Sequence, residues 1–193
     1  IGTLNGMFAF GIWQPEAATL TLVRDRLGEK PLYYAQTDDH FLVFASEIGA
    51  LIASGLVATE IDPAAVREYF AYGYVPDPLT IYRGVFKLPP ASTLTLRRGS
   101  TGMPTPARYW RPPVDAGAYA SFDEACTDLL PLLDNAVQQQ MVADVPLGAF
   151  LSGGVDSLLV FAPRDEQSVL RRTSAWTDPA RTLRRSPCRA FVR

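Results

Sequence analysis

The stretch Val145-Pro146-Leu147-Gly148-Ala149-Phe150-Leu151, followed directly by Ser152-Gly153-Gly154-Val155-Asp156-Ser157, decides how the fold is interpreted. Its first seven residues form a short apolar run, which is typical of a buried strand in a parallel sheet. The two glycines allow a tight turn and let backbone N–H groups approach an anion. The serines add hydroxyl donors, and a helix beginning near Asp156 directs its positive end to the same place. The sequence therefore predicts a phosphate-binding loop between a strand and a helix.

This loop lacks the lysine of a Walker A motif, so it is better suited to holding pyrophosphate as a leaving group than to γ-phosphoryl transfer. The alternative is an ordinary serine-glycine connection between a strand and a helix. The apolar run in front of the loop favours nucleotide binding. Residues 144–157 resemble the PP-loop of the ATP-pyrophosphatase superfamily, and specifically that of the asparagine synthetases.

The resemblance implies a reaction and a set of binding residues. In that family the loop binds the triphosphate of ATP, the substrate carboxylate attacks the α-phosphorus, and ammonia then displaces AMP from the acyl-adenylate. By resemblance, ATP and Mg²⁺ are the expected cofactors, and Leu151 places its backbone against the adenine. The residues expected to hold the pyrophosphate part are Ser152, Gly153, Gly154, Asp156 and Ser157.

The N-terminal part of the chain resembles the second half of a class II glutaminase domain, which has an N-terminal-nucleophile hydrolase fold. The segments that carry this resemblance are Leu4–Phe10, Arg24–Tyr34 and Phe44–Ile48, and the family's linker is matched by Tyr72–Pro76 and Lys87–Pro90. Arg24 and Asp25 are expected to support the glutaminase half structurally, as no more than an ion pair that closes a strand. Lys30-Pro31 is expected to form a tight turn.

No catalytic residue is assigned, because the nucleophile of that family is an N-terminal cysteine and Ile1 stands at the start of this chain. Cys126 is expected to be a small apolar core residue of a helix. The single histidine, His40, lies in a polar turn and is expected to be solvated, which leaves little support for a serine protease or a zinc enzyme. No metal-ligand set is assigned from the sequence.

Apolar patterns predict the local structure of the first half. Ser46 and Glu47 precede a short helix, Ile48–Ala53, and Asp62 with Pro63 forms the start of another. Prolines between residues 72 and 113 predict an irregular, stiff connector with a short strand near Thr93–Leu96. Strands are predicted at Met7–Trp13, Thr19–Val23 and Phe41–Ala45.

A capping-box pattern, Ser121-Phe122-Asp123-Glu124, predicts a second structural unit that begins with a helix to about Val142. Pro131 is expected to kink this helix or delay its start. The side chains expected to point inward are Leu129, Leu132, Leu133 and Val137.

Together these patterns predict an α/β and α+β protein: the C-terminal half of an N-terminal-nucleophile (αββα) glutaminase domain, followed by the first β-α elements of a parallel-sheet PP-loop domain. The expected organisation is a partial class II glutamine amidotransferase domain at 1–72, a proline-rich linker at 73–120, the start of the asparagine synthetase domain at 121–161 and an arginine-rich tail at 162–193.

Charge separates that tail from the rest. Residues 1–161 carry 10 basic and 17 acidic residues, whereas residues 162–193 carry eight arginines against three acidic residues. An out-of-frame origin of the tail is one hypothesis, because the family likeness stops inside a helix. A basic arm for nucleic acid is the weaker alternative, since the tail lacks interleaved aromatic residues, so no nucleic-acid partner is expected.

The composition is that of a globular protein, with 48% hydrophobic and 20% charged residues among 193. No membrane-length apolar run or signal peptide is visible, so no membrane association is expected, and two cysteines in unrelated contexts favour a reducing cytoplasm over a disulfide framework. The missing initiator methionine suggests that an upstream part is absent, and only 36 residues follow Ser157 where the family pattern continues further, so the chain is expected to be truncated at both ends.

The resemblance implies a ligase that adenylates aspartate with ATP and amidates it with ammonia from glutamine, as a possible homodimer in the full-length family. An exosortase-associated or other asparagine-synthetase-like amidotransferase, such as a β-lactam synthetase, is the first alternative. A catalytically dead, truncated product is the second, and this chain alone is expected to be inactive.

Overall fold

The computed structural model describes residues 1–100, 102–114, 117 and 119–144. The chain divides into two compact units, Ile1–Asp115 and Ala116–Arg193, and each is described by itself. Within the described residues no helix is long and apolar enough to span a bilayer.

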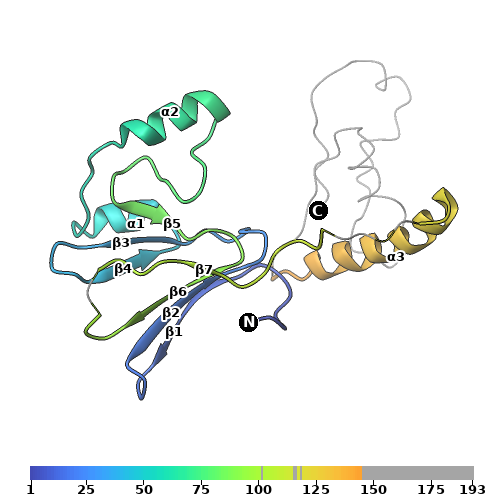
Figure 1. Cartoon of the computed structure of the whole chain (residues 1–193), viewed down its shortest axis with the longest axis horizontal. Coiled ribbons are helices and arrows are strands. Elements are labelled where there is room, and N and C mark those ends of the chain that lie inside the picture. Colours follow the sequence, from blue (N-terminus) through green and yellow to red (C-terminus); the bar gives the residue numbers. More distant parts are fainter. Residues whose placement is uncertain (101, 115–116, 118, 145–193) are drawn as a thin grey trace. The chain divides into compact units, whose positions relative to one another are not determined.

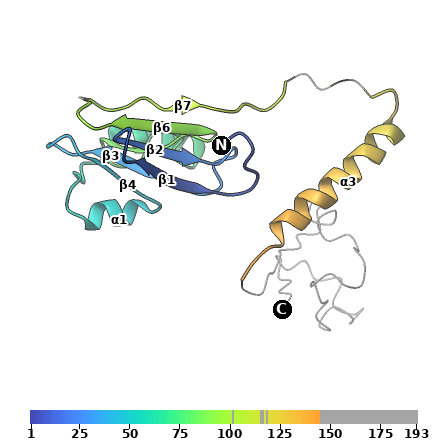
Figure 2. The same cartoon turned by 90° about the horizontal axis from the view of Figure 1, so that it is seen from below.

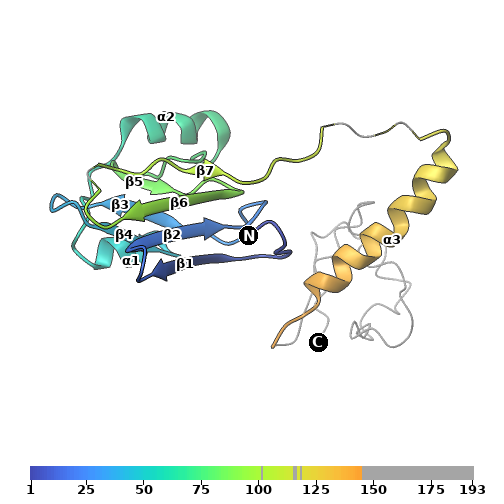
Figure 3. The same ribbon diagram turned by 60° about the horizontal axis from the view of Figure 1, so that its bottom comes forward.

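The first unit contains a four-stranded antiparallel sheet with the strand order β1-β2-β6-β7. Its register sets Phe10 opposite Val23 and Leu22 opposite Leu94. Figure 3 shows the four strands side by side in this order. The strands are β1 (Ala9–Gln14), β2 (Thr19–Arg24), β6 (Ser92–Arg97) and β7 (Ala107–Arg108).

A second antiparallel sheet has the order β4-β3-β5 (Figure 1). Its strands are β3 (Tyr33–Gln36), β4 (Leu42–Ala45) and β5 (Val85–Lys87). Alternation along β3 divides its side chains between two cores, as the pleat requires. Tyr34 packs in a cluster with Leu22 and Leu94 of the first sheet. Ala35 packs in another with Leu51.

Leu51 belongs to helix α1 (Ile48–Ala53), which lies beside β4 in Figure 2. The first cluster joins the two sheets and the second joins the second sheet to α1, so the layers run sheet, sheet, helix. The mixed fold class is therefore confirmed in the coarse form of helices with antiparallel sheets.

Helix α2 (Pro63–Tyr72) begins as the sequence predicts. The Asp62 carboxylate accepts a 2.8 Å hydrogen bond from the amide of Ala64, and Pro63 occupies the first turn. Gly73 ends the helix with a φ of 78°, a left-handed conformation that glycine adopts without strain.

The predicted short strand near Thr93–Leu96 is confirmed as β6, whereas β5 at Val85–Lys87 was not predicted within the proline-rich segment. Val85, Leu88 and Leu94 are buried there. The prolines before and after β5 lie in its flanking turns, where a missing N–H disrupts no strand pairing. β3 was also missed, because Tyr33-Tyr34-Ala35-Gln36 shows no polar alternation: both of its faces are covered.

In the second unit Ser121 caps helix α3 (Phe122–Gln140) as predicted, and Glu124 reaches back to the residue before the cap. Ser121 Oγ accepts a hydrogen bond from the amide of Glu124 at 3.2 Å, and the Glu124 carboxylate accepts one from the amide of Ala120 at 2.9 Å. Pro131 lies inside the helix, so the delayed start does not occur.

The predicted inward face of α3 is only partly found. Leu129 and Leu132 are exposed, whereas Leu133 and Val137 are partly buried. The predicted strand at 145–151 lies outside the described residues.

Candidate functional site

The residues predicted to bind pyrophosphate and adenine, from Leu151 to Ser157, lie outside the described residues, as does the arginine-rich tail. Among the described residues, a network of charged side chains lies at the end of β2 in the first unit and is centred on Arg24 and Asp25.

Asp25 is a buried carboxylate, 1% exposed, that gathers backbone amides from two parts of the chain. Its Oδ1 accepts hydrogen bonds from the amides of Leu27 at 3.2 Å and Glu29 at 2.9 Å. Its Oδ2 accepts from the amides of Lys30 at 2.9 Å and Phe8 at 3.3 Å. The carboxylate thus closes the loop after β2 and ties it to the segment that leads into β1.

These bonds set the charge state of Asp25. Burial by itself raises the pKa of this carboxyl, because it disfavours the ionised form. The amide hydrogen bonds, led by those from Lys30, Glu29 and Phe8, outweigh burial together, and the pKa of Asp25 lies below its ordinary value. The group is therefore ionised at neutral pH.

Arg24 donates hydrogen bonds to carbonyls of the same loop and of the chain after β5. Its guanidinium donates to the carbonyls of Lys30 at 2.8 Å, Gly28 at 2.7 Å and Leu88 at 2.6 Å. Its ion pair is with Asp77, at 3.3 Å, which corrects the expectation that Arg24 and Asp25 form an ion pair. The two adjacent side chains therefore have different partners: Arg24 donates to backbone carbonyls, and Asp25 accepts from backbone amides.

Asp77 also lies 3.6 Å from the ammonium of Lys87, which donates a hydrogen bond to the carbonyl of Val75. This network fastens the segment after α2 to the end of β2. Tyr109 adds a further link, since its hydroxyl donates to the Arg24 carbonyl at 2.7 Å. Burial first, and then the charge of Asp25, raise the pKa of Tyr109, which keeps that hydroxyl a donor.

Gly28 allows the loop to close this tightly. Its φ is +69°, and a Cβ added there would lie 2.8 Å from Pro90 Cγ and 3.1 Å from the Arg24 guanidinium. Only glycine fits both the backbone conformation and the space.

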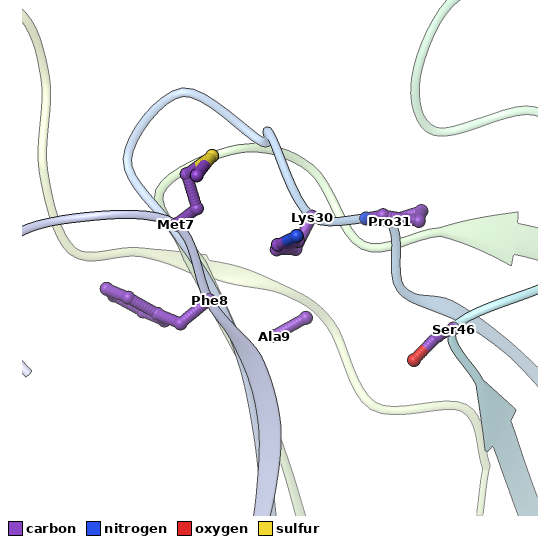
Figure 4. A pocket seen from close by; sticks show the side chains of 6 residues that line it. All are labelled: Met7, Phe8, Ala9, Lys30, Pro31 and Ser46. Atoms are coloured by element: carbon purple, nitrogen blue, oxygen red, sulfur yellow. The ribbon is translucent and has the colours of Figure 1, made fainter. Parts of the chain in front are cut away.

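A cavity of about 360 Å³ opens beside this loop (Figure 4). The lining residues come from the chain before and within β1, the loop after β2 and the chain before α1. They are Met7, Phe8, Ala9, Lys30, Pro31 and Ser46. Phe8 and Lys30 are also two of the residues whose amides Asp25 binds.

Sequence reasoning did not identify this cavity. The sequence pattern predicts only a turn at Lys30-Pro31 and only the start of a helix at Ser46. Because 16 positions separate Lys30 from Ser46, no local pattern relates them.

The histidine and the cysteine among the described residues do not form a second candidate site. His40 is exposed in a turn with a φ of 64°, as expected. Cys126 is a free thiol and only partly buried on α3, so the prediction of a core residue is wrong. No group of three potential metal ligands occurs in the part of the chain that the structure describes.

Two family models match the chain in sequence. The glutamine amidotransferase domain model matches residues 1–110, and the asparagine synthase model matches residues 128–186. The chain belongs to the glutamine-hydrolysing asparagine synthetase family. The order of the two matches agrees with the resemblance found in the sequence. The second match extends into the arginine-rich tail, whose origin stays a prediction.

Curated relatives of this family align along most of the chain. Asparagine synthetase [glutamine-hydrolyzing] 3 of Bacillus subtilis is 37% identical over 161 residues, which is 82% of this chain and 25% of the relative. A putative asparagine synthetase of Methanocaldococcus jannaschii is 36% identical over 158 residues, 81% of this chain and 30% of the relative. Amidase chry2 of Gibberella zeae is 35% identical over 161 residues, 81% and 23% respectively. The chain thus spans about a quarter of the length of the relatives it matches.

Proposed function

We propose that this chain is part of an ATP-dependent amide ligase of the asparagine synthetase type. The reaction adenylates aspartate with ATP and Mg²⁺ and amidates it with ammonia released from glutamine. The observation that carries the proposal is the order of the two family matches, an amidotransferase domain at 1–110 followed by asparagine synthase at 128–186.

Within this proposal, the first unit is the C-terminal half of an N-terminal-nucleophile glutaminase domain. The layering of the unit supports this assignment, because sheet, sheet and helix are three of the four layers of an αββα sandwich. Arg24 and Asp25 support the glutaminase half by fixing the loop after β2.

The PP-loop is the ATP site of the proposal. Ser152, Gly153, Gly154, Asp156 and Ser157 hold the pyrophosphate part of Mg²⁺-ATP, and Leu151 contacts the adenine through its backbone. The chemistry of the residues supports this role: glycines expose backbone donors and serines add hydroxyl donors.

A related amidotransferase acting on another carboxylate is the second candidate. It is favoured by the likeness to amidase chry2 and to amidase chyE of Penicillium rubens, which is 32% identical over 160 residues. The two candidates share the same adenylation step and differ only in the acceptor.

The test is binding of Mg²⁺-ATP to the whole chain by isothermal titration calorimetry. Asp156→Ala and Gly154→Val are expected to weaken binding at least tenfold, because they remove a loop carboxylate and obstruct the backbone donors. Asp128→Ala and Gly117→Val are the matched controls: Asp128 is an exposed residue of α3, and Gly117 has nothing within 4 Å of an added Cβ. Equal binding by all five proteins, or by none, would contradict the proposed ATP site.

A further inference from the structure

Lys30 has a backbone held from both sides by buried charged residues. Its amide donates to the Asp25 carboxylate at 2.9 Å, and its carbonyl accepts from Arg24 Nε at 2.8 Å. Asp25 and Arg24 are 1% and 8% exposed. These two bonds fix the backbone of Lys30 and therefore the direction in which its Cα–Cβ bond points.

That side chain enters the cavity beside the loop. Figure 4 shows the Lys30 amine between Met7 and Ser46, in the middle of the lining residues. Among the described residues, the Lys30 ammonium has no hydrogen-bond acceptor, and the Ser46 hydroxyl has no hydrogen-bond partner. By contrast, Lys87, Arg24 and Arg83 each lie within 4 Å of a carboxylate.

The rest of the lining is apolar, and is formed by Met7, Phe8, Ala9 and Pro31. One positive charge and one hydroxyl match a singly charged oxyanion better than inorganic phosphate, which carries more negative charge and more acceptor oxygens. The apolar walls favour an organic anion with a hydrocarbon part, and a volume of about 360 Å³ is sufficient for a small molecule of this kind.

We infer that this cavity is a binding site for a small monocarboxylate, in which Lys30 and Ser46 hold the carboxylate and Met7 and Phe8 contact the hydrocarbon part. Arg24 and Asp25 are positioning residues for Lys30. The site is independent of the proposed ATP site and does not depend on the reaction proposed above.

Pentanoate is the probe, titrated into the whole ¹⁵N-labelled chain and followed by the amide signals of Ala9 and Lys30. A saturable shift in the millimolar range is expected. Pentan-1-ol, which keeps the hydrocarbon part, and inorganic phosphate, which keeps the charge, are each expected to bind at least tenfold more weakly.

Lys30→Met removes the ammonium and keeps an unbranched side chain, and it is expected to weaken pentanoate binding at least tenfold. Ser46→Ala removes one hydrogen bond to a charged group, which corresponds to a weakening on the order of tenfold. Arg67→Met is the matched control, because it removes an exposed cation from α2, which contributes nothing to the cavity lining. Its binding is expected to equal that of the unmodified chain.

Lys30 and Ser46 are exposed side chains, so their substitution leaves the buried core intact. The inference is overturned if pentanoate gives no saturable shift, if phosphate binds as tightly as pentanoate, or if Lys30→Met binds pentanoate like Arg67→Met. Loss in Lys30→Met with retention in Arg67→Met supports it.

Discussion

The two oxygens of the Asp25 carboxylate accept hydrogen bonds from four backbone amides, three in the loop after β2 and one at Phe8, just before β1. A backbone N–H buried without an acceptor costs free energy comparable to a lost hydrogen bond. Without this side chain, these partly buried amides would lose their common acceptor. The residue is therefore required for the closure of the loop.

Asp25→Asn is expected to lower the free energy of unfolding by about 2 to 4 kcal/mol, because one carboxylate oxygen becomes an NH₂ group that faces N–H donors. Urea unfolding followed by circular dichroism measures the change. Asp62→Asn is the matched control: asparagine caps a helix about as well as aspartate, so a change below about 0.5 kcal/mol is expected. Equal effects of the two substitutions would show that the amide cluster at Asp25 contributes nothing special.

The stabilisation by Asp25 is expected to depend on pH. Its pKa in the folded chain lies below the ordinary value of 3.8, so folding favours the ionised form. The contribution is complete above the unfolded pKa and is lost as pH falls through the folded pKa. The stability difference between the unmodified chain and Asp25→Asn should be constant from pH 7 to about pH 5 and shrink below about pH 4. A difference that grows on acidification contradicts this sign.

At the scale of elements, the loop after β2 is shaped by a glycine and two charged side chains. Gly28 brings the backbone against Pro90 and Arg24, and Arg24 bonds both to this loop and to the Leu88 carbonyl. This contact joins the end of β2 to the chain between β5 and β6. Lys30 and Pro31 of this loop form part of the cavity lining.

Gly28→Ala is expected to lower the free energy of unfolding by about 2 to 4 kcal/mol, since it combines a left-handed backbone with a steric clash. Gly55→Ala is the matched control. Its φ of +70° is nearly the same, but an added Cβ meets nothing within 4 Å. Only the backbone penalty of about 1 kcal/mol is expected there. Chemical denaturation of both variants measures the two losses in the free energy of unfolding. A smaller loss for Gly28→Ala than for Gly55→Ala would contradict the close packing of Gly28 against Pro90 and Arg24.

At the scale of the whole molecule, the chain covers about a quarter of its curated relatives. A phosphate-binding loop depends on the neighbouring strands that hold its donors in place. The asparagine synthase match in this chain is confined to residues 128–186. Binding of a nucleotide needs only the loop and its immediate support, whereas synthesis of an amide needs a complete synthetase domain.

We predict that this polypeptide alone releases no pyrophosphate that depends on aspartate and ATP. A coupled pyrophosphate assay with ammonia or glutamine as nitrogen donor measures this, and a full-length relative provides the positive control. Aspartate-dependent release above the background without protein would refute the prediction.

The sequence by itself determined the family, most strands and the helix starts. These elements follow from patterns among neighbouring residues, and the structure contains each of them. The patterns are the apolar alternation at Thr19–Val23, the Asp62-Pro63 cap and the Ser121 cap. The PP-loop likewise follows from adjacent residues, and its role stays a prediction.

Only the tertiary structure decided the partners of Arg24 and Asp25 and the cavity at Lys30. Arg24 pairs with Asp77, 53 residues away, rather than with its neighbour. β5 could not be predicted from the sequence, because a three-residue strand in a proline-rich segment is too short to show an alternating apolar pattern. These residues form a strand because they pair with β3. Contacts across the chain depend on how the sheets stack and on which buried donors need acceptors, and neither is written in the spacing of neighbouring residues.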